Sequence, residues 1–298
     1  MSFENTGSLW RDYRIEHWNG NTEDLIRWFT ELCAEAVGTM LFTAVGSVAR
    51  DPALTNGLLL SALVFSLAPV SGAKLNPAVS LASYLEDVRV APNGEKLHVF
   101  AIGGVLCLLE WGVQLGGASC GVALARKMTS SGGSVAGCFV PPTATPGSVV
   151  LANESVGTLL LVFTVLRTST GSPKTARFGM LAPLAIGLAL YAAADGAGRF
   201  TGGCFNPARY IAGVAQGSCA FDWAYASSYL PAHLLGSATA FIANWFIMFA
   251  VKTVNASPKR PTNGDGYVLM SDGSGSAPGD VGARFGTHAR VRAGRVGL

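Results

Sequence analysis

The chain has 298 residues, of which 50% are hydrophobic and 13% are charged, and its formal net charge is +3. Soluble globular domains carry about 25% charged residues, so the composition excludes an ordinary soluble domain and indicates an integral membrane protein. The four histidines are scattered, and no catalytic or nucleotide-binding motif occurs in the sequence. We therefore predict no metal site, no cofactor, no nucleic-acid partner and no enzymatic activity.

The chain in order reads as a polar lead-in, a series of apolar segments and a polar tail. A helix needs about 20 apolar residues to cross about 30 Å of hydrocarbon. Six candidate spans are found at about 30–49, 54–72, 98–125, 150–166, 178–195 and 228–251. Two shorter apolar segments, 77–85 and 207–217, are each long enough for only about half a bilayer.

The two ends of the chain differ from its apolar centre. Residues 1–29 are predicted to form a cytoplasmic N-terminal segment, and 30–252 to form one membrane domain. Residues 253–298 are rich in Gly, Ser and Pro, which predicts a disordered cytoplasmic tail.

Lysine and arginine in the connecting segments predict the orientation. They are more frequent in the segments that six spans would place on one face with both termini, and this bias marks the cytoplasmic side. These residues are Arg89, Lys96, Arg167, Lys174, Arg177, Lys252, Lys259 and Arg260. The plasma membrane and an intracellular membrane both remain open.

The chain contains a repeat. Residues 35–43 read EAVGTMLFT and residues 154–164 read ESVGTLLLVFT, and each string opens the first span of one half. Each half continues with a second span, an Asn-Pro-Ala triplet, a short apolar segment and a third span. Three spans are an odd number, so the halves, about 30–125 and 150–252, must cross the membrane in opposite directions. This arrangement is an inverted repeat with its functional site near the midplane.

The two triplets explain the short segments. Asn is a preferred N-cap and Pro is favoured at the first helical position, so each triplet starts a helix. Inversion brings the two helix starts together in the middle of the membrane. Their positive dipole ends and the asparagine amides would orient water and repel cations in a pore. The predicted pore residues are Asn76, Pro77, Ala78, Asn206, Pro207 and Ala208.

These stretches resemble the signature of a known family. SGAKLNPAV at 71–79 and TGGCFNPAR at 201–209 are similar to the two signature loops of the aquaporins, or major intrinsic proteins. AEAVGT in the first span and the pair Gln114 and Gly117 in the third add to the resemblance, which covers about 30–252. It implies an all-α membrane fold of six transmembrane helices and two re-entrant half-helices. It also implies a homotetramer in which each protomer holds a passive channel for water and small neutral solutes that excludes protons and ions.

The resemblance also implies a selectivity filter made by Asn56, Ala194, Gly203 and Arg209. Water-specific members of the family have Phe and His at the two positions that Asn56 and Ala194 occupy. Glycerol facilitators have two aromatic residues in the filter and Asp after the arginine, where this chain has Tyr210. The small residues predict a wide polar aperture that passes glycerol, urea, ammonia or hydrogen peroxide.

An alternative for the filter remains open. Phe200 or Phe205 could fill the space, which would leave a strictly water-selective pore.

Three carboxylates and one lysine lie within apolar stretches. By resemblance, Glu35 and Glu154 hydrogen-bond the backbone of the two signature loops and hold them, with a proton relay as the alternative. Lys74 replaces the family's usual histidine at the inner pore entrance, where it either gates the pore or extends to the headgroups. Glu110 has no role in the family pattern.

Three further questions stay open at this stage. Cys138 and Cys219 fall on the same predicted outer face, so a disulfide between them is one alternative. A secondary transporter with inverted repeats would need a coupling-ion site, for which the midplane offers only the two symmetric glutamates. A structural or adhesion role is not distinguished by the sequence.

Overall fold

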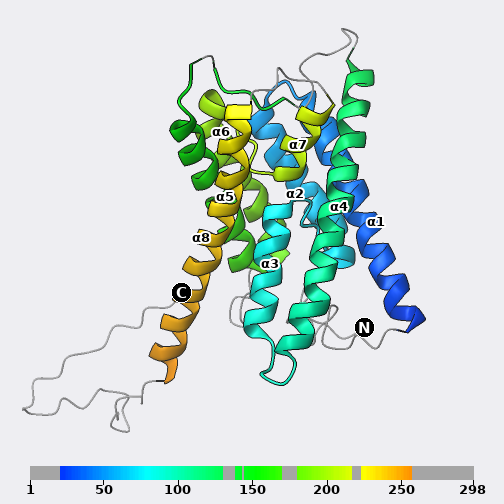
Figure 1. The fold of residues 1–298 in the computed structure, drawn as a ribbon, viewed down its shortest axis with the longest axis vertical. Helices are drawn as coiled ribbons and strands as arrows, with labels where there is room; N and C mark the ends of the chain where they lie inside the picture. The colour runs from blue at the N-terminus through cyan, green and yellow to red at the C-terminus, as the bar shows by residue number, and fades with distance from the viewer. Residues whose placement is uncertain (1–20, 130–137, 143, 170–179, 217–222, 257–298) are drawn as a thin grey trace, which may run out of the picture. The chain divides into compact units, whose positions relative to one another are not determined.

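The computed structural model describes residues 21–129, 138–142, 144–169, 180–216 and 223–256. Apart from a 3-10 turn at 180–181, every regular element in these ranges is an α-helix (Figure 1). The helices are α1 (Thr22–Ser47), α2 (Pro52–Ser71), α3 (Pro77–Val90), α4 (Lys96–Met128), α5 (Gly147–Ser169), α6 (Ala182–Thr201), α7 (Pro207–Ala215) and α8 (Trp223–Ala256). The prediction of six long helices and two short ones, each short one starting at an Asn-Pro pair, is confirmed.

The chain divides into two units. Residues up to Ile247 form one compact unit, and residues from Met248 onward form a second one that contains the end of α8. The domain boundaries expected from the sequence at 1–29, 30–252 and 253–298 remain a prediction.

Four of the described helices are long and apolar enough to cross a membrane by length and composition, namely α2, α4, α5 and α8. The other two long helices carry charges that lower their mean hydropathy. Glu31 and Glu35 lie in α1, and Asp195 and Arg199 lie in α6. Glu35 is fully buried, so this charge is covered by protein and does not face the surroundings of the bundle.

Local sequence signals explain where the helices begin and end. Asn21 caps α1 by accepting a hydrogen bond from the Asp24 N–H at 2.9 Å, and the Asp24 carboxylate accepts one in return from the Asn21 N–H at 3.4 Å. Asp51 caps α2, where Pro52 occupies the first turn. Helices α2 and α6 both end at a glycine in the left-handed conformation, Gly72 and Gly202, as is common at helix C-termini.

The second helices of the two halves cross closely. A Cβ atom added at Gly187 of α6 would lie 1.9 Å from the Ser61 Oγ and 2.3 Å from the Gly57 carbonyl oxygen of α2. Glycine is therefore required here for the two backbones to approach. The helices pack through an apolar core that includes Leu60 and Leu190.

The half-helices lie inside this frame. Both α3 and α7 pack against α4, and Figure 1 shows them following one another along it. The Ser237 hydroxyl of α8 donates a hydrogen bond to the Ala78 carbonyl at 2.7 Å. The starts of α3 and α7 therefore meet within the first unit, surrounded by the long helices.

Candidate functional site

The two loops that precede the half-helices have the same backbone course. Three positions in each loop have positive φ, and they correspond residue by residue: Gly72 (89°) and Gly202 (82°), Ala73 (47°) and Gly203 (64°), Leu75 (51°) and Phe205 (50°). Residues with a side chain adopt this conformation at a cost, and it persists where the surroundings fix it. Such conformations concentrate at functional sites.

The two asparagines join the loops to each other. The Asn76 Oδ1 accepts from the Ala78 N–H at 2.9 Å, and the Asn206 Oδ1 accepts from the Ala208 N–H at 3.0 Å, so each caps its own half-helix. The Asn76 Nδ2 donates to the Phe205 carbonyl at 2.8 Å. The Asn206 Nδ2 donates to the Leu75 carbonyl at 2.8 Å. Each half-helix start is therefore tied to the opposite loop.

Glu35 of α1 holds the first loop. Its carboxylate accepts hydrogen bonds from the backbone N–H groups of Lys74 at 3.0 Å and Leu75 at 2.7 Å. The Ser71 hydroxyl at 2.7 Å and the Gln114 amide at 2.8 Å donate to the same carboxylate. These four donors satisfy a carboxylate that is fully buried.

Glu154 of α5 holds the second loop in the same way. It accepts from the backbone N–H groups of Cys204 at 3.1 Å and Phe205 at 2.8 Å. The Thr201 hydroxyl donates to it at 2.5 Å, and the His233 Nε2 lies 2.9 Å from it. The structure thus brings each glutamate to the loop that the sequence analysis expected.

The sequence analysis did not name the hydroxyl groups that donate to Glu35 and Glu154, although the repeat contains a signal for both. Ser71 and Thr201 stand five residues before Asn76 and Asn206, so the repeat itself marks an equivalent hydroxyl in each loop. His233 occupies in the second half the place that Gln114 has in the first. Because histidine stands where the first half has glutamine, a comparison of the two halves does not identify His233.

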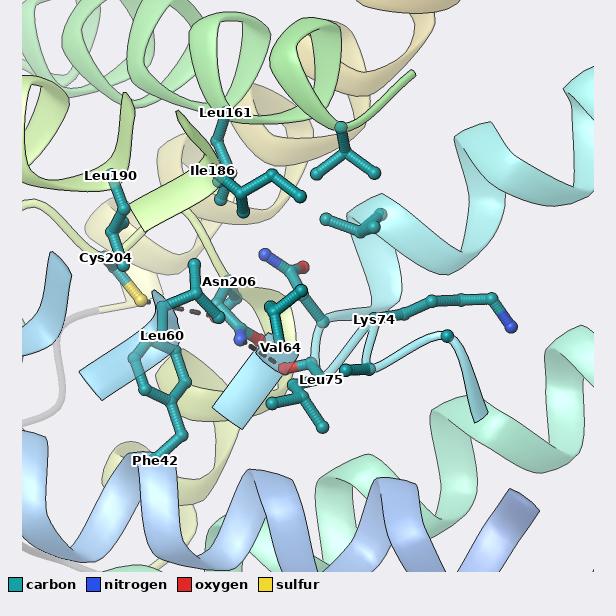
Figure 2. A pocket seen from close by; sticks show the side chains of 15 residues that line it. Phe42, Leu60, Val64, Lys74, Leu75, Leu161, Ile186, Leu190, Cys204 and Asn206 are labelled. Carbon is teal, nitrogen blue, oxygen red and sulfur yellow. Dashed lines mark hydrogen bonds between the residues drawn. The ribbon is translucent and has the colours of Figure 1, made fainter. Parts of the chain in front are cut away.

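A narrow cavity, here called the central cavity, reaches the two asparagines (Figure 2). Its volume for water centres is about 20 Å³, which is room for one or two water molecules. The cavity has apolar walls and polar groups where Asn76 and Asn206 meet it. The apolar residues include Phe42, Leu60, Val64, Leu161, Ile186 and Leu190.

Arg209 follows Asn206 in the first turn of α7 and is 3% exposed. Its Nη1 donates to the Asn56 Oδ1 at 2.9 Å. The Asn56 amide donates to the Pro52 carbonyl at 2.7 Å and to the Gly46 carbonyl at 3.3 Å. Asn56 therefore uses its polar atoms inside the protein and fixes the guanidinium.

Two aromatic rings contact the Arg209 guanidinium. The Phe42 ring centroid is 4.4 Å from the Arg209 Cζ and the Phe139 centroid is 5.1 Å away, both within the range of cation–π contacts. Phe205 lies instead in the buried core, and Phe200 is 37% exposed beside Arg199. The rings that contact Arg209 in the described part of the chain are thus not the two named as alternatives from the sequence.

Ala194 and Gly203 form a second pair. A Cβ atom added at Gly203 would lie 3.1 Å from the Ala194 Cα, so the two residues are in direct contact. The expected filter residues are therefore found as two contacting pairs, Asn56 with Arg209 and Ala194 with Gly203, and their assembly into one filter stays a prediction. Phe139 was missed because it lies at no fixed spacing from the motifs. Phe42 was missed although it stands seven residues after Glu35, inside the repeated string EAVGTMLFT.

The remaining residues with open roles are also placed. Lys74 borders the central cavity, and its ammonium forms an ion pair with Glu110 of α4. Cys138 is disulfide-bonded, while Cys219 lies outside the described residues. Within the described ranges, no cluster of His, Cys, Asp and Glu could hold a metal ion.

Comparison with known proteins adds independent findings. The family model described as "Major intrinsic protein" matches residues 24–244. The chain is 34% identical over 214 residues to the probable aquaporin TIP2-1 of Oryza sativa subsp. japonica, which covers 64% of this chain and 78% of the relative. It is 30% identical over 209 residues to aquaporin-8 of Mus musculus, over 64% of this chain and 73% of the relative. Among solved structures, the aquaglyceroporin from Plasmodium falciparum superposes with a TM-score of 0.58 and 20% identity, covering 76% of this chain and 99% of the other.

Proposed function

The chain belongs to the major intrinsic protein family, and from this membership we propose how its site conducts water and small neutral solutes. The protein is an integral membrane channel, as the named aquaporin relatives indicate. Family membership implies a passive pore and not an enzyme. The proposal concerns which residues line the path, which solutes pass and how the protein is assembled.

The observation that carries the proposal is the reciprocal bonding of Asn76 and Asn206. Each Nδ2 has two hydrogens, and one of them is used by the opposite loop. The second is available to the oxygen of a water molecule in the central cavity, which both asparagines line. A water that accepts from these amides turns its hydrogens away on both sides, which interrupts a chain of proton-carrying hydrogen bonds.

Positive charge at the same place supports exclusion of cations. The N-termini of α3 and α7 point their dipoles at the asparagines. Arg209 adds a fixed cation one turn further along. We infer that protons and metal cations are repelled while neutral molecules pass.

The filter is proposed to consist of Asn56, Ala194, Gly203 and Arg209. The small Ala194 and Gly203 support an aperture wide enough for glycerol, urea, ammonia or hydrogen peroxide besides water. The Arg209 Nε is buried and has no partner within the described residues, so a water or solute oxygen that reaches it would satisfy this donor. Asn56 contributes by orienting Arg209 rather than by bonding the solute.

A second candidate is a strictly water-selective pore. It is favoured by one observation, the contact of the Phe42 and Phe139 rings with the Arg209 guanidinium. Aromatic rings beside the arginine reduce the space for larger solutes.

The deciding experiment is stopped-flow light scattering on proteoliposomes that contain the purified protein. An impermeant osmotic step is applied first, followed by steps of glycerol and of urea. Fast shrinkage followed by solute-driven reswelling supports the multisolute pore. Fast shrinkage without reswelling supports the water-selective pore, and shrinkage no faster than that of empty liposomes refutes the conduction mechanism.

Assembly and orientation complete the proposal. We propose a homotetramer with one pore in each protomer and with both termini in the cytoplasm. The first part rests on the family and the second on the distribution of Lys and Arg in the connecting segments. Native mass spectrometry of the solubilised protein tests the tetramer, and protease protection of terminal epitope tags in sealed cells tests the orientation.

A further inference from the structure

Lys74 and Glu110 form an ion pair that takes no part in the pore mechanism proposed so far. Their side chains are 8% and 2% exposed, respectively. Glu110 stands in the apolar stretch LCLLEWG of α4. A charged carboxylate in such a place is stable only with a partner, and the Lys74 ammonium is that partner.

The backbone of Lys74 is fixed by a different residue. Its N–H donates to Glu35 of α1 at 3.0 Å, and the next N–H, of Leu75, donates to the same carboxylate at 2.7 Å. The loop therefore keeps its place without Glu110. Glu110 contacts Lys74 through the lysine side-chain ammonium.

Lys74 stands between two cavities. On one side is the central cavity that leads to Asn76 and Asn206. On the other is a second cavity of about 10 Å³ beside Glu110, which Tyr84 and Asp87 also line. Figure 2 shows the Lys74 side chain extending away from Asn206 and the apolar walls of the central cavity.

We propose that Glu110 is a positioning residue that holds the Lys74 ammonium outside the central cavity. The inference rests on the proposed path of water through that cavity. An ammonium that loses its carboxylate leaves its apolar surroundings for water. The two oxygens of Glu35 already accept four hydrogen bonds, and Asp87 in the second cavity is engaged in another interaction. The freed ammonium therefore turns to the water of the central cavity. A cation there obstructs a cavity that has room for only one or two water molecules.

The test compares osmotic water permeability per protein molecule for the intact chain and three variants in proteoliposomes. Glu110→Gln removes the partner and keeps the shape of the side chain. Lys74→Gln combined with Glu110→Gln removes both charges. Asp87→Asn is the matched control, because it removes a different carboxylate from the same small cavity.

The expected results follow from the fraction of time that the ammonium spends in the path. If the freed ammonium occupies the path about two thirds of the time, permeability of Glu110→Gln falls about threefold. The double variant is expected to return to the value of the intact chain, and Asp87→Asn to stay there. A purely structural role predicts no rescue by the double variant, since that variant removes the ion pair as well.

Three outcomes overturn the inference. They are a Glu110→Gln variant as permeable as the intact chain, a double variant no better than Glu110→Gln, and an Asp87→Asn variant as impaired as Glu110→Gln. Each variant is first checked for an unchanged elution profile in detergent. If the intact chain itself gives no permeability above that of empty liposomes, the conduction mechanism has failed instead, so the two failures are distinguishable.

Discussion

Replacing Glu154 by glutamine tests whether this buried carboxylate holds α7 in place. Glu154 receives four donors, among them the N–H groups of Cys204 and Phe205, and it has two oxygens to accept them. Glutamine keeps the shape but has one oxygen, so about two of the donors lose their acceptor and face an NH₂ group. Hydrogen bonds to a charged group contribute about 1.5–3 kcal/mol each. The free energy of unfolding is therefore expected to fall by about 3–6 kcal/mol.

The assay is thermal unfolding of the solubilised protein together with water permeability in proteoliposomes. A loss of this size lowers the Tm by about 5–10 °C in a chain of this length. Permeability is expected to fall as well, because the loop that carries Asn206 loses its anchor. The control is Glu95→Gln, which removes an exposed carboxylate that makes no capping hydrogen bond at the start of α4. A Glu154→Gln variant that unfolds within about 2 °C of the intact chain and conducts normally would refute the reasoning.

Three other predictions concern packing, the filter and the cavity. Gly187→Ala is expected to lower the free energy of unfolding by about 1–3 kcal/mol, because the added Cβ separates α2 from α6. Gly112→Ala is the control, because a Cβ there meets nothing within 4 Å, and it is expected to leave the free energy of unfolding unchanged. Equal Tm values for the two variants would contradict this prediction. Phe139→Ala removes a ring that contacts the Arg209 guanidinium. This variant is expected to have a higher ratio of glycerol to water permeability in the swelling assay. An unchanged ratio would show that the ring does not limit the aperture. Mercuric ion is expected to block water flow by binding Cys204, whose side chain lines the central cavity. The Cys204→Ser variant is therefore expected to resist mercuric ion, and the Cys33→Ser variant, which changes an exposed cysteine, is expected to stay sensitive. Block of both variants alike would place the reactive thiol elsewhere.

The fold was open to prediction because its signals are local or periodic. Apolar length predicts the long helices, and Asn followed by Pro predicts the start of α3 at Pro77 and of α7 at Pro207. The repeated Glu-x-x-Gly-Thr string predicts that Glu35 and Glu154 have equivalent places, and each was found on its expected loop.

The site was only partly open to prediction, because hydrogen-bonded partners can be far apart in the chain. Arg209 was placed by its position after Asn206, yet its partner Asn56 lies 153 residues away. Phe139 comes from a connection whose course follows from no periodicity. The aromatic residues suggested by proximity in sequence, Phe200 and Phe205, have other surroundings.

The sequence by itself determined the membrane-spanning helices, the inverted repeat and the two capped half-helices. These features depend on interactions within a few residues and on the apolar length that a bilayer requires. Only the tertiary structure decided that Asn76 bonds the Phe205 carbonyl and that the Lys74 ammonium pairs with Glu110. Such contacts form when packed helices bring distant residues together, and a buried polar group accepts whichever partner the packing provides because leaving it unpaired costs free energy.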